Sequence, residues 1–84
     1  MLKTVEKLIK ADRDTILGNH RLHIDSDGTE YYYYHATCIC KVNHNERTFT
    51  LDDGGWKTPS TSRAISNYRY YFKSLGYFEI DTRK

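Results

Sequence analysis

The segment 30–42 constrains the fold of this chain more than any other part of the sequence. It is rich in tyrosine, threonine, isoleucine, valine and cysteine, side chains that suit the pleated, half-buried surface of a β-strand. Because successive side chains alternate between the two faces of a strand, one parity is predicted to face the core and the other to face outward. The predicted inner set is Tyr32, Tyr34, Ala36, Cys38, Cys40 and Val42, and the predicted outer set is Tyr31, Tyr33, His35, Thr37, Ile39 and Lys41.

Further strands are predicted on both sides of this segment. Leu22 and Ile24 alternate with polar residues, and Phe49 and Leu51 do so later in the chain, so both pairs are predicted to point inward. Polar segments containing Gly, Asp or Asn are typical of the turns between such strands. The last four residues are expected to fray. The expected elements are a strand at 15–24, a turn at 25–28, the central strand at 30–42, a turn at 43–46, a third strand at 47–51 and a short last strand at 77–80.

Two helices are predicted from apolar side chains at three- and four-residue spacing. Gly76 is suited to the position just after the second helix, because glycine readily adopts a positive φ. The order α-β-β-β-α-β then predicts an α+β fold, with an antiparallel sheet of three to four strands, an N-terminal helix and a C-terminal amphipathic helix. The predicted buried positions are Leu2, Val5, Leu8 and Ile9 in the first helix and Ile65, Tyr68, Phe72 and Leu75 in the second.

A chain of 84 residues is expected to form one small domain, residues 1–84, because short chains bury a low fraction of their surface. This length excludes a multidomain enzyme and a dinucleotide-binding fold. Aromatic residues make up 14% of the chain, which argues against disorder. No apolar run is long enough for a membrane span or a signal peptide, so a membrane partner is not expected.

Neither a metal site nor a catalytic group is predicted. Cys38 and Cys40 are expected to share one strand face while His35 points the other way, and the sequence contains no Cys-x-x-Cys motif. Asp52 and Asp53 occupy a predicted turn, where aspartate is favoured for conformational reasons. We therefore expect a protein that is not an enzyme and that has no cofactor.

The segment 54–63, Gly-Gly-Trp-Lys-Thr-Pro-Ser-Thr-Ser-Arg, leads into the second helix. At least one of its glycines is predicted to have a positive φ, and Ser60 or Thr61 is predicted to cap the helix. A helix N-terminus favours anions, so basic side chains beside it indicate a phosphate or carboxylate site. The alternative is an ordinary turn with a hydroxyl cap. The predicted anion-binding residues are Lys57, Thr58, Ser60, Thr61 and Arg63.

The second helix also has a basic face. The whole chain has a formal net charge of +2, but the stretch from Lys57 to Lys73 contains four basic residues and no acidic one. Arginine and lysine neutralise phosphates, and tyrosine rings nearby are available for stacking on bases. Arg69 and Lys73 therefore extend the predicted nucleic-acid-binding set. The alternative is a basic face that is simply solvated.

Four aromatic or imidazole side chains are predicted to bind a partner: Tyr31, Tyr33, His35 and Trp56. Exposed aromatic residues on one strand face are enriched at binding interfaces. The alternative for the strand residues is that the first helix covers them. The Trp56 indole is expected to pack over the end of the sheet, with its Nε1–H bonded to a polar group. Its alternative role is an exposed interface anchor.

Residues 15–72 resemble a pattern found in small uncharacterised proteins of tailed phages, in which a His-x-Thr-x-Ile strand precedes a Gly-Trp-x-Thr-x-Thr-Thr turn and a short helix. Ser60 stands where that pattern has its first threonine of the final pair. The resemblance implies a phage origin and a location in the host cell cytoplasm. The matching pieces are His35-Ala36-Thr37-Cys38-Ile39, then Gly54-Gly55-Trp56, Thr58 and Ser60-Thr61, then a helix bearing Ile65, Asn67 and Tyr68.

Small phage proteins of one domain are often accessory factors that bind a host macromolecule. The resemblance therefore implies a non-enzymatic accessory protein that binds and inhibits a host defence or nucleic-acid-processing complex, of the anti-CRISPR or anti-restriction type. Its partner would be a host protein or a ribonucleoprotein complex, and the protein itself is expected to be a monomer or a small homo-oligomer. The alternative is a small nucleic-acid-binding module that uses the basic helix, residues 60–75.

Overall fold

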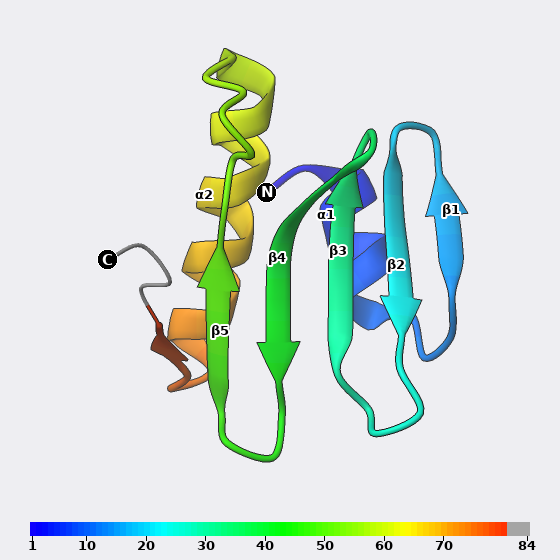
Figure 1. The fold of residues 1–84 in the computed structure, drawn as a ribbon, viewed down its shortest axis with the longest axis vertical. Coiled ribbons are helices and arrows are strands. Elements are labelled where there is room, and N and C mark those ends of the chain that lie inside the picture. Colours follow the sequence, from blue (N-terminus) through cyan, green and yellow to red (C-terminus); the bar gives the residue numbers. More distant parts are fainter. Residues whose placement is uncertain (81–84) are drawn as a thin grey trace.

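The computed structural model describes residues 1–80, so the expected fraying of the last four residues lies outside the described part of the chain. The described residues form an α+β fold, as predicted, with one helix near each end of the sequence (Figure 1). The elements are α1 (Lys3–Lys10), β1 (Thr15–Leu17), β2 (His20–Ile24), β3 (Glu30–Tyr34), β4 (Thr37–Asn43), β5 (Thr48–Leu51), α2 (Pro59–Ser74) and β6 (Phe78–Glu79).

The strands form a single sheet with the order β1-β2-β3-β4-β5-β6, so each strand lies beside its neighbour in sequence. The first five strands pair antiparallel, whereas β6 pairs with β5 in a parallel orientation after the chain has passed through α2. The prediction of an antiparallel sheet with three to four strands is therefore wrong in both respects. The short last strand expected at 77–80 is confirmed as β6.

Two predicted strands are in fact hairpins, which accounts for both extra strands. The segment 15–24 turns at Gly18, which has a φ of 61°, and becomes β1 and β2. The segment 30–42 turns at His35, whose φ of 56° is unusual for a residue other than glycine, and becomes β3 and β4. The two turns lie at the same end of the sheet, and the His35 N–H donates to the Asn19 carbonyl at 2.8 Å.

A register shift between Tyr32 and Tyr33 changes which residues of β4 face the core. Such an irregularity places an extra residue on one strand and reverses the alternation beyond it. Ile39, predicted to point outward, is consequently fully buried. Tyr33 pairs with Cys38, which therefore shares the outer face of the sheet instead of the inner face predicted for it. The inward prediction is confirmed for Tyr32, Cys40 and Val42, while Ala36 lies exposed in the turn.

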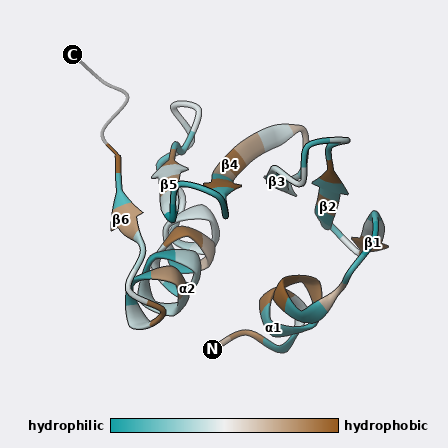
Figure 2. Ribbon diagram, turned by 90° about the horizontal axis from the view of Figure 1, so that it is seen from below, coloured by the Kyte–Doolittle hydropathy of each residue, from teal (hydrophilic) through white to brown (hydrophobic). Residues whose placement is uncertain are grey.

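Both helices pack on one face of the curved sheet (Figure 2). This arrangement leaves the opposite face uncovered by any helix of the described residues. The core between the layers contains Val5, Leu8, Leu22, Tyr32, Ile39, Cys40, Val42, Phe49, Ala64, Tyr68 and Phe72. The inward predictions are thus confirmed for the first helix, and Phe49 and Leu51 likewise lie in or against the core.

Helix α2 ends as predicted, although its buried stripe is shifted from the expected one. Gly76 has a φ of 85°, its N–H donates to the Lys73 carbonyl, and the next N–H donates to the Phe72 carbonyl, which is the hydrogen-bond pattern of a glycine C-cap. Leu75, predicted to be buried, is 47% exposed because the helix has already ended there. Thr61 and Ala64 extend the buried stripe towards the start of the helix.

Within the described residues, no helix has the length and the apolar character that would be needed to cross a membrane.

Candidate functional site

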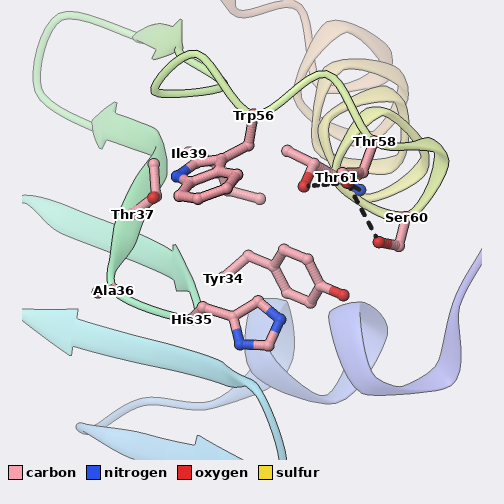
Figure 3. Close-up of a pocket in the computed structure, with 9 residues that line it drawn as sticks. All are labelled: Tyr34, His35, Ala36, Thr37, Ile39, Trp56, Thr58, Ser60 and Thr61. Atoms are coloured by element: carbon pink, nitrogen blue, oxygen red, sulfur yellow. Dashed lines mark hydrogen bonds between the residues drawn. The ribbon is translucent and has the colours of Figure 1, made fainter.

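A cavity of about 340 Å³ lies where the β3–β4 turn, the loop after β5 and the first turn of α2 meet. Trp56 and Tyr34 lie on opposite sides of this space, and the hydroxyl side chains of α2 close a third side (Figure 3). Its surface is mostly apolar, as is usual for pockets that bind small groups. The lining residues are Tyr34, His35, Ala36, Thr37, Ile39, Trp56, Thr58, Ser60 and Thr61.

The loop that carries Trp56 is held by a series of short hydrogen bonds. The Asp52 N–H donates to the Ile39 carbonyl at 3.0 Å, which fixes the start of the loop to β4. The side chain of Asp52 accepts from the Gly54 N–H at 2.9 Å, and the Trp56 N–H donates to the carbonyl of Asp53 at 2.9 Å. These local bonds are typical of aspartate in turns, and they give the loop a defined conformation.

Both glycines of the loop have a positive φ, 61° at Gly54 and 88° at Gly55, which confirms the prediction made for them. Gly54 also packs closely on the sheet. A Cβ placed on it would lie 2.6 Å from the Cγ2 of Thr37. The loop therefore approaches β4 at a distance that only glycine permits.

The position of Trp56 differs from the expected one. Its side chain lines the cavity but is 63% exposed, so the prediction that it packs away over the end of the sheet is wrong. No hydrogen bond from its Nε1–H is present among residues 1–80. An indole held at the rim of an apolar pocket by an ordered loop has the geometry of an interface anchor, which was the alternative considered for it.

The N-cap of α2 is Thr58, not Ser60 or Thr61 as predicted. The Thr58 Oγ1 accepts from the Thr61 N–H at 3.3 Å and donates to the Thr61 Oγ1 at 2.9 Å. Pro59 has no N–H, and the Ser62 N–H donates to the Thr58 carbonyl. Of the first-turn N–H groups, only that of Ser60 is left to interact with a ligand. The predicted anion site therefore offers fewer N–H donors than an uncapped helix N-terminus.

The positive charge beside the cavity comes from Lys57 and Arg63. Both are exposed, and neither forms an ion pair within the described residues. The first turn of α2 contains no acidic side chain. Arg63 lines a second hollow of about 300 Å³, which shares Tyr34 and Ser60 with the first cavity. None of the residues that line either hollow is acidic, although Asp52 and Asp53 lie earlier in the loop that carries Trp56.

His20 also lines the second hollow. Its ring centroid is 4.8 Å from that of Tyr34, and the Tyr34 ring centroid is 4.4 Å from that of His35. Burial lowers the pKa of His20 below its ordinary value of 6.5, and the nearby His35 lowers it further. The buried Nδ1 of His20 has no hydrogen-bond partner among the described residues. The ring is therefore held in its neutral form near neutral pH.

The other three residues predicted to bind a partner, Tyr31, Tyr33 and His35, lie in two different parts of the structure. Tyr31 and Tyr33 lie half-buried on the open face of the sheet, so the alternative that α1 covers them is wrong. His35 belongs to the turn beside the cavity instead of to this face. Arg21 lies 4.1 Å above the Tyr33 ring and Lys41 lies 5.6 Å from the Tyr31 ring, so both phenols already make cation–π contacts.

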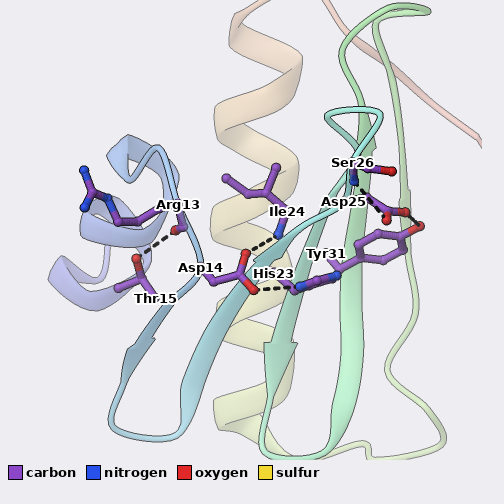
Figure 4. Close-up of polar contacts among 8 residues, drawn as sticks. All are labelled: Arg13, Asp14, Thr15, His23, Ile24, Asp25, Ser26 and Tyr31. Atoms are coloured by element: carbon purple, nitrogen blue, oxygen red, sulfur yellow. Dashed lines mark hydrogen bonds and ion pairs between the residues drawn. The ribbon is translucent and has the colours of Figure 1, made fainter.

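Polar contacts tie the same face to its flanking loops (Figure 4). The Tyr31 hydroxyl donates to Asp25 at 3.1 Å, and this bond raises the pKa of Tyr31. Asp14 accepts from the Ile24 N–H at 2.8 Å and lies 2.8 Å from the Nδ1 of His23. The backbone bond from Ile24, followed by the contact with His23, lowers the pKa of Asp14. Tyr31 and Tyr33 thus already make side-chain contacts within their own sheet and its turns, whereas the Trp56 side chain is largely exposed.

The predicted basic face of α2 is partly neutralised by β6. The guanidinium of Arg69 contacts both carboxylate oxygens of Glu79, at 3.0 and 3.4 Å, and Lys73 lies 3.7 Å from the same group. The hydrogen bond from Arg69 lowers the pKa of Glu79. The structure therefore divides the predicted nucleic-acid-binding set, because Lys57 and Arg63 lie near the start of α2 whereas Arg69 and Lys73 are paired in its C-terminal half.

A polar chain that sequence reasoning missed links three distant segments. The ring of His44 contacts the Tyr77 hydroxyl at 2.6 Å through Nδ1 and Glu30 at 2.9 Å through Nε2. Glu30 also accepts from the Tyr32 hydroxyl at 2.8 Å. This chain connects β3, the β4–β5 turn and the residue that precedes β6. Nothing local in the sequence signals a contact between residues 33 positions apart.

The histidine and cysteine residues that invite a metal hypothesis are dispersed. Cys38 lies on the open face and Cys40 in the core, and burial raises the pKa of both thiols. Among residues 1–80, no three His, Cys, Asp or Glu side chains are close enough together to bind one ion.

Comparison of the chain with known proteins gives no match to a family model, a curated protein or a solved structure.

Proposed function

We propose that this protein is a non-enzymatic binding protein that docks on a partner protein through Trp56 and the cavity beside it. The observation that carries the proposal is the 63% exposure of an indole whose loop is fixed by hydrogen bonds. Tryptophan is the residue most enriched among interface side chains that dominate binding energy. A rigid anchor loses little conformational entropy on binding, so the ordering of this loop favours affinity.

The biological role that we propose is the one implied by the phage-like motif. The protein would act as an accessory factor in the cytoplasm of a bacterial host, where it inhibits a defence or nucleic-acid-processing complex of the anti-CRISPR or anti-restriction type. The support comes from the motif itself, whose Trp56, Thr58, Ser60 and Thr61 all line the cavity. The uneven charge of the chain also suits such a partner, since residues 25–55 contain six acidic and two basic side chains.

A pull-down from host lysate, infected and uninfected, tests this proposal. Wild type is compared with Trp56→Ala and with the control Tyr70→Ala, which removes an aromatic side chain that is 73% exposed on α2 and does not line the cavity. We expect one stoichiometric partner that is retained by wild type and Tyr70→Ala but lost by Trp56→Ala, while the melting temperatures of all three stay similar. Absence of a stoichiometric partner in both lysates would overturn the proposal.

The alternative is a nucleic-acid-binding module that uses α2. It has less support, because Glu79 pairs with Arg69 and Lys73 and leaves only two of the four cations without an ion pair among residues 1–80. Fluorescence anisotropy with labelled single- and double-stranded oligonucleotides tests it, because binding by phosphate contacts must weaken steeply as salt rises. Binding at low salt that is lost in Arg63→Glu would favour this alternative over docking on a protein.

A further inference from the structure

We propose that the cavity beside Trp56 binds an acidic peptide segment of the partner, with one large apolar side chain in the cavity and carboxylates next to it. This inference rests on the proposed function, since it specifies the chemistry of the partner at the same site. Two independent observations support it: the apolar lining of the cavity and the positive charge around it.

The lining favours an apolar side chain over a nucleobase. Tyr34, Ile39 and Trp56 contribute carbon surface, and little of the cavity wall is polar. The hydroxyls of Thr58 and Thr61 are already bonded to each other. A nucleobase would bring several donors and acceptors into this space without partners, which is costly, whereas a leucine or phenylalanine side chain would not. The volume of about 340 Å³ lies at the small end of ligand pockets.

The charges favour acidic flanking residues. Lys57 follows the anchor Trp56 directly in the loop, and Arg63 lines the second hollow, which shares Tyr34 and Ser60 with the cavity. The Ser60 N–H and the dipole of α2 add partial positive charge at the start of this helix. Basic groups are unfavourable at a helix N-terminus in the free protein, and carboxylates of a bound segment would offset this cost. Lys57 is the chain neighbour of a residue that lines the cavity, and Arg63 lines the adjoining hollow, so acidic residues are expected next to the anchor.

The probe for the test is a capped heptapeptide, Glu-Asp-Gly-Phe-Gly-Asp-Glu, with three matched ligands. These are the version with Lys at the four acidic positions, the version with Ala in place of Phe, and a decamer of thymidylate. Trp56 is the only tryptophan of the chain, so its fluorescence and the NMR signal of its indole N–H report on the cavity alone. None of the ligands contains tryptophan, so the signal comes from the protein.

We expect the acidic Phe peptide to shift the Trp56 signals at millimolar concentration, and the Ala version to bind at least tenfold more weakly. The basic peptide should leave the signals unchanged. In Lys57→Glu/Arg63→Glu the preference should reverse in favour of the basic peptide. The control Lys7→Glu/Arg13→Glu makes the same change in net charge at exposed residues that line neither hollow, and it should keep the wild-type preference.

Three results would overturn this inference: equal shifts with acidic and basic peptides, no shift with the acidic peptide, or a shift with the thymidylate decamer alone. The first would leave an apolar docking site without charge selectivity, and the last would favour the nucleic-acid alternative. The proposed function fails separately, through the loss of Trp56-dependent capture from lysate. A partner captured in that way while the acidic peptide gives no shift would therefore reject the inference and retain the proposed function.

Discussion

Gly54 lies so close to Thr37 that a Cβ on the glycine would come within 2.6 Å of the threonine Cγ2. This contact joins the loop that carries Trp56 to the start of β4, and it sets the distance between Trp56 and the β3–β4 turn across the cavity. The loop also adopts a positive φ at Gly54. Two separate requirements therefore select glycine at this position, one conformational and one steric.

Gly54→Ala should consequently cost more stability than Gly55→Ala. Both glycines have a positive φ, but a Cβ on Gly55 would meet nothing within 4 Å. A positive φ costs a residue with a Cβ about 1 kcal/mol, and we expect this value for Gly55→Ala. Moving a stiff β-branched threonine adds an overpacking cost, for a total of about 2–4 kcal/mol in Gly54→Ala.

Urea unfolding measures this difference, and the emission maximum of Trp56 shows whether the loop has moved. We expect a shifted maximum in Gly54→Ala and an unchanged one in Gly55→Ala. Equal destabilisation by the two substitutions would mean that the contact with Thr37 does not position the loop.

The hydroxyl residues at the start of α2 give a second prediction. Thr58→Ala removes the side chain that accepts the Thr61 N–H, and it should destabilise the protein by about 1 kcal/mol, the usual contribution of an N-cap. Ser60→Ala is the matched control, because Ser60 is exposed and caps nothing, and it should change the free energy of unfolding by less than about 0.5 kcal/mol. Thermal and urea unfolding of both variants check the assignment. A larger loss in Ser60→Ala than in Thr58→Ala would contradict it.

Apolar periodicity and glycine signals predicted much of this fold correctly. Val5 and Leu8 repeat at helical spacing and are fully buried, and Gly76 ends α2 as expected. These features depend on residues that are close in sequence and on side chains with strong preferences. The number of strands was not predictable in the same way. His35 turns the chain with a positive φ although neither it nor Ala36 is a strong turn former, so 30–42 has the composition of one continuous strand.

Only part of the candidate site could be predicted, because only part of it is determined by residues that are close in sequence. Trp56 and Thr58 belong to a segment whose paired glycines and hydroxyl residues indicate a turn that leads into a helix, and both residues line the cavity. Tyr34 and Ile39 also line it but could not be assigned from the sequence, because their positions depend on the hairpin turn and on the register shift at Tyr32 and Tyr33. Arg69 pairs with Glu79, and no local pattern in the sequence indicates that contact.

Two buried tyrosines that pack on each other should respond oppositely to loss of their hydroxyls. The rings of Tyr32 and Tyr68 lie 4.6 Å apart, and both residues are fully buried. The Tyr32 hydroxyl donates to Glu30, whereas the Tyr68 hydroxyl has no partner among residues 1–80. Tyr32→Phe should cost about 1–2 kcal/mol because it leaves the carboxylate without this donor. Tyr68→Phe should be neutral or stabilise the protein by up to about 1 kcal/mol, because a buried hydroxyl without a partner is unfavourable.

Urea unfolding at neutral pH compares the two variants, with the slope of the transition as the check on a common unfolded state. Destabilisation by Tyr68→Phe comparable to that by Tyr32→Phe would show that the Tyr68 hydroxyl is hydrogen-bonded in solution.

The contact between Glu79 and Arg69 predicts how β6 responds to acid. The hydrogen bond from Arg69, with the nearby charge of Lys73, lowers the pKa of Glu79 below its ordinary value of 4.5. A carboxylate whose pKa is lower in the folded than in the unfolded protein binds fewer protons when folded. Its stabilising contribution is therefore complete above about pH 4.5 and is lost as the pH falls through the folded-state pKa. Because the pair lies at the surface, its contribution is small.

Glu79→Gln should thus lower stability relative to wild type at pH 7, and the difference between the two proteins should shrink as the pH falls below 4.5. Urea unfolding between pH 7 and pH 3 measures that difference, and hydrogen exchange locates its origin. The Phe78 N–H donates to the carbonyl of Arg47, just before β5, at 2.9 Å, and the Ile80 N–H donates to that of Phe49 in β5 at 2.8 Å. Their exchange should accelerate in Glu79→Gln at pH 7 while that of the Tyr32 N–H in the central sheet does not. A stability difference that stays constant down to pH 3 would show that the charge of Glu79 does not hold β6 against the sheet.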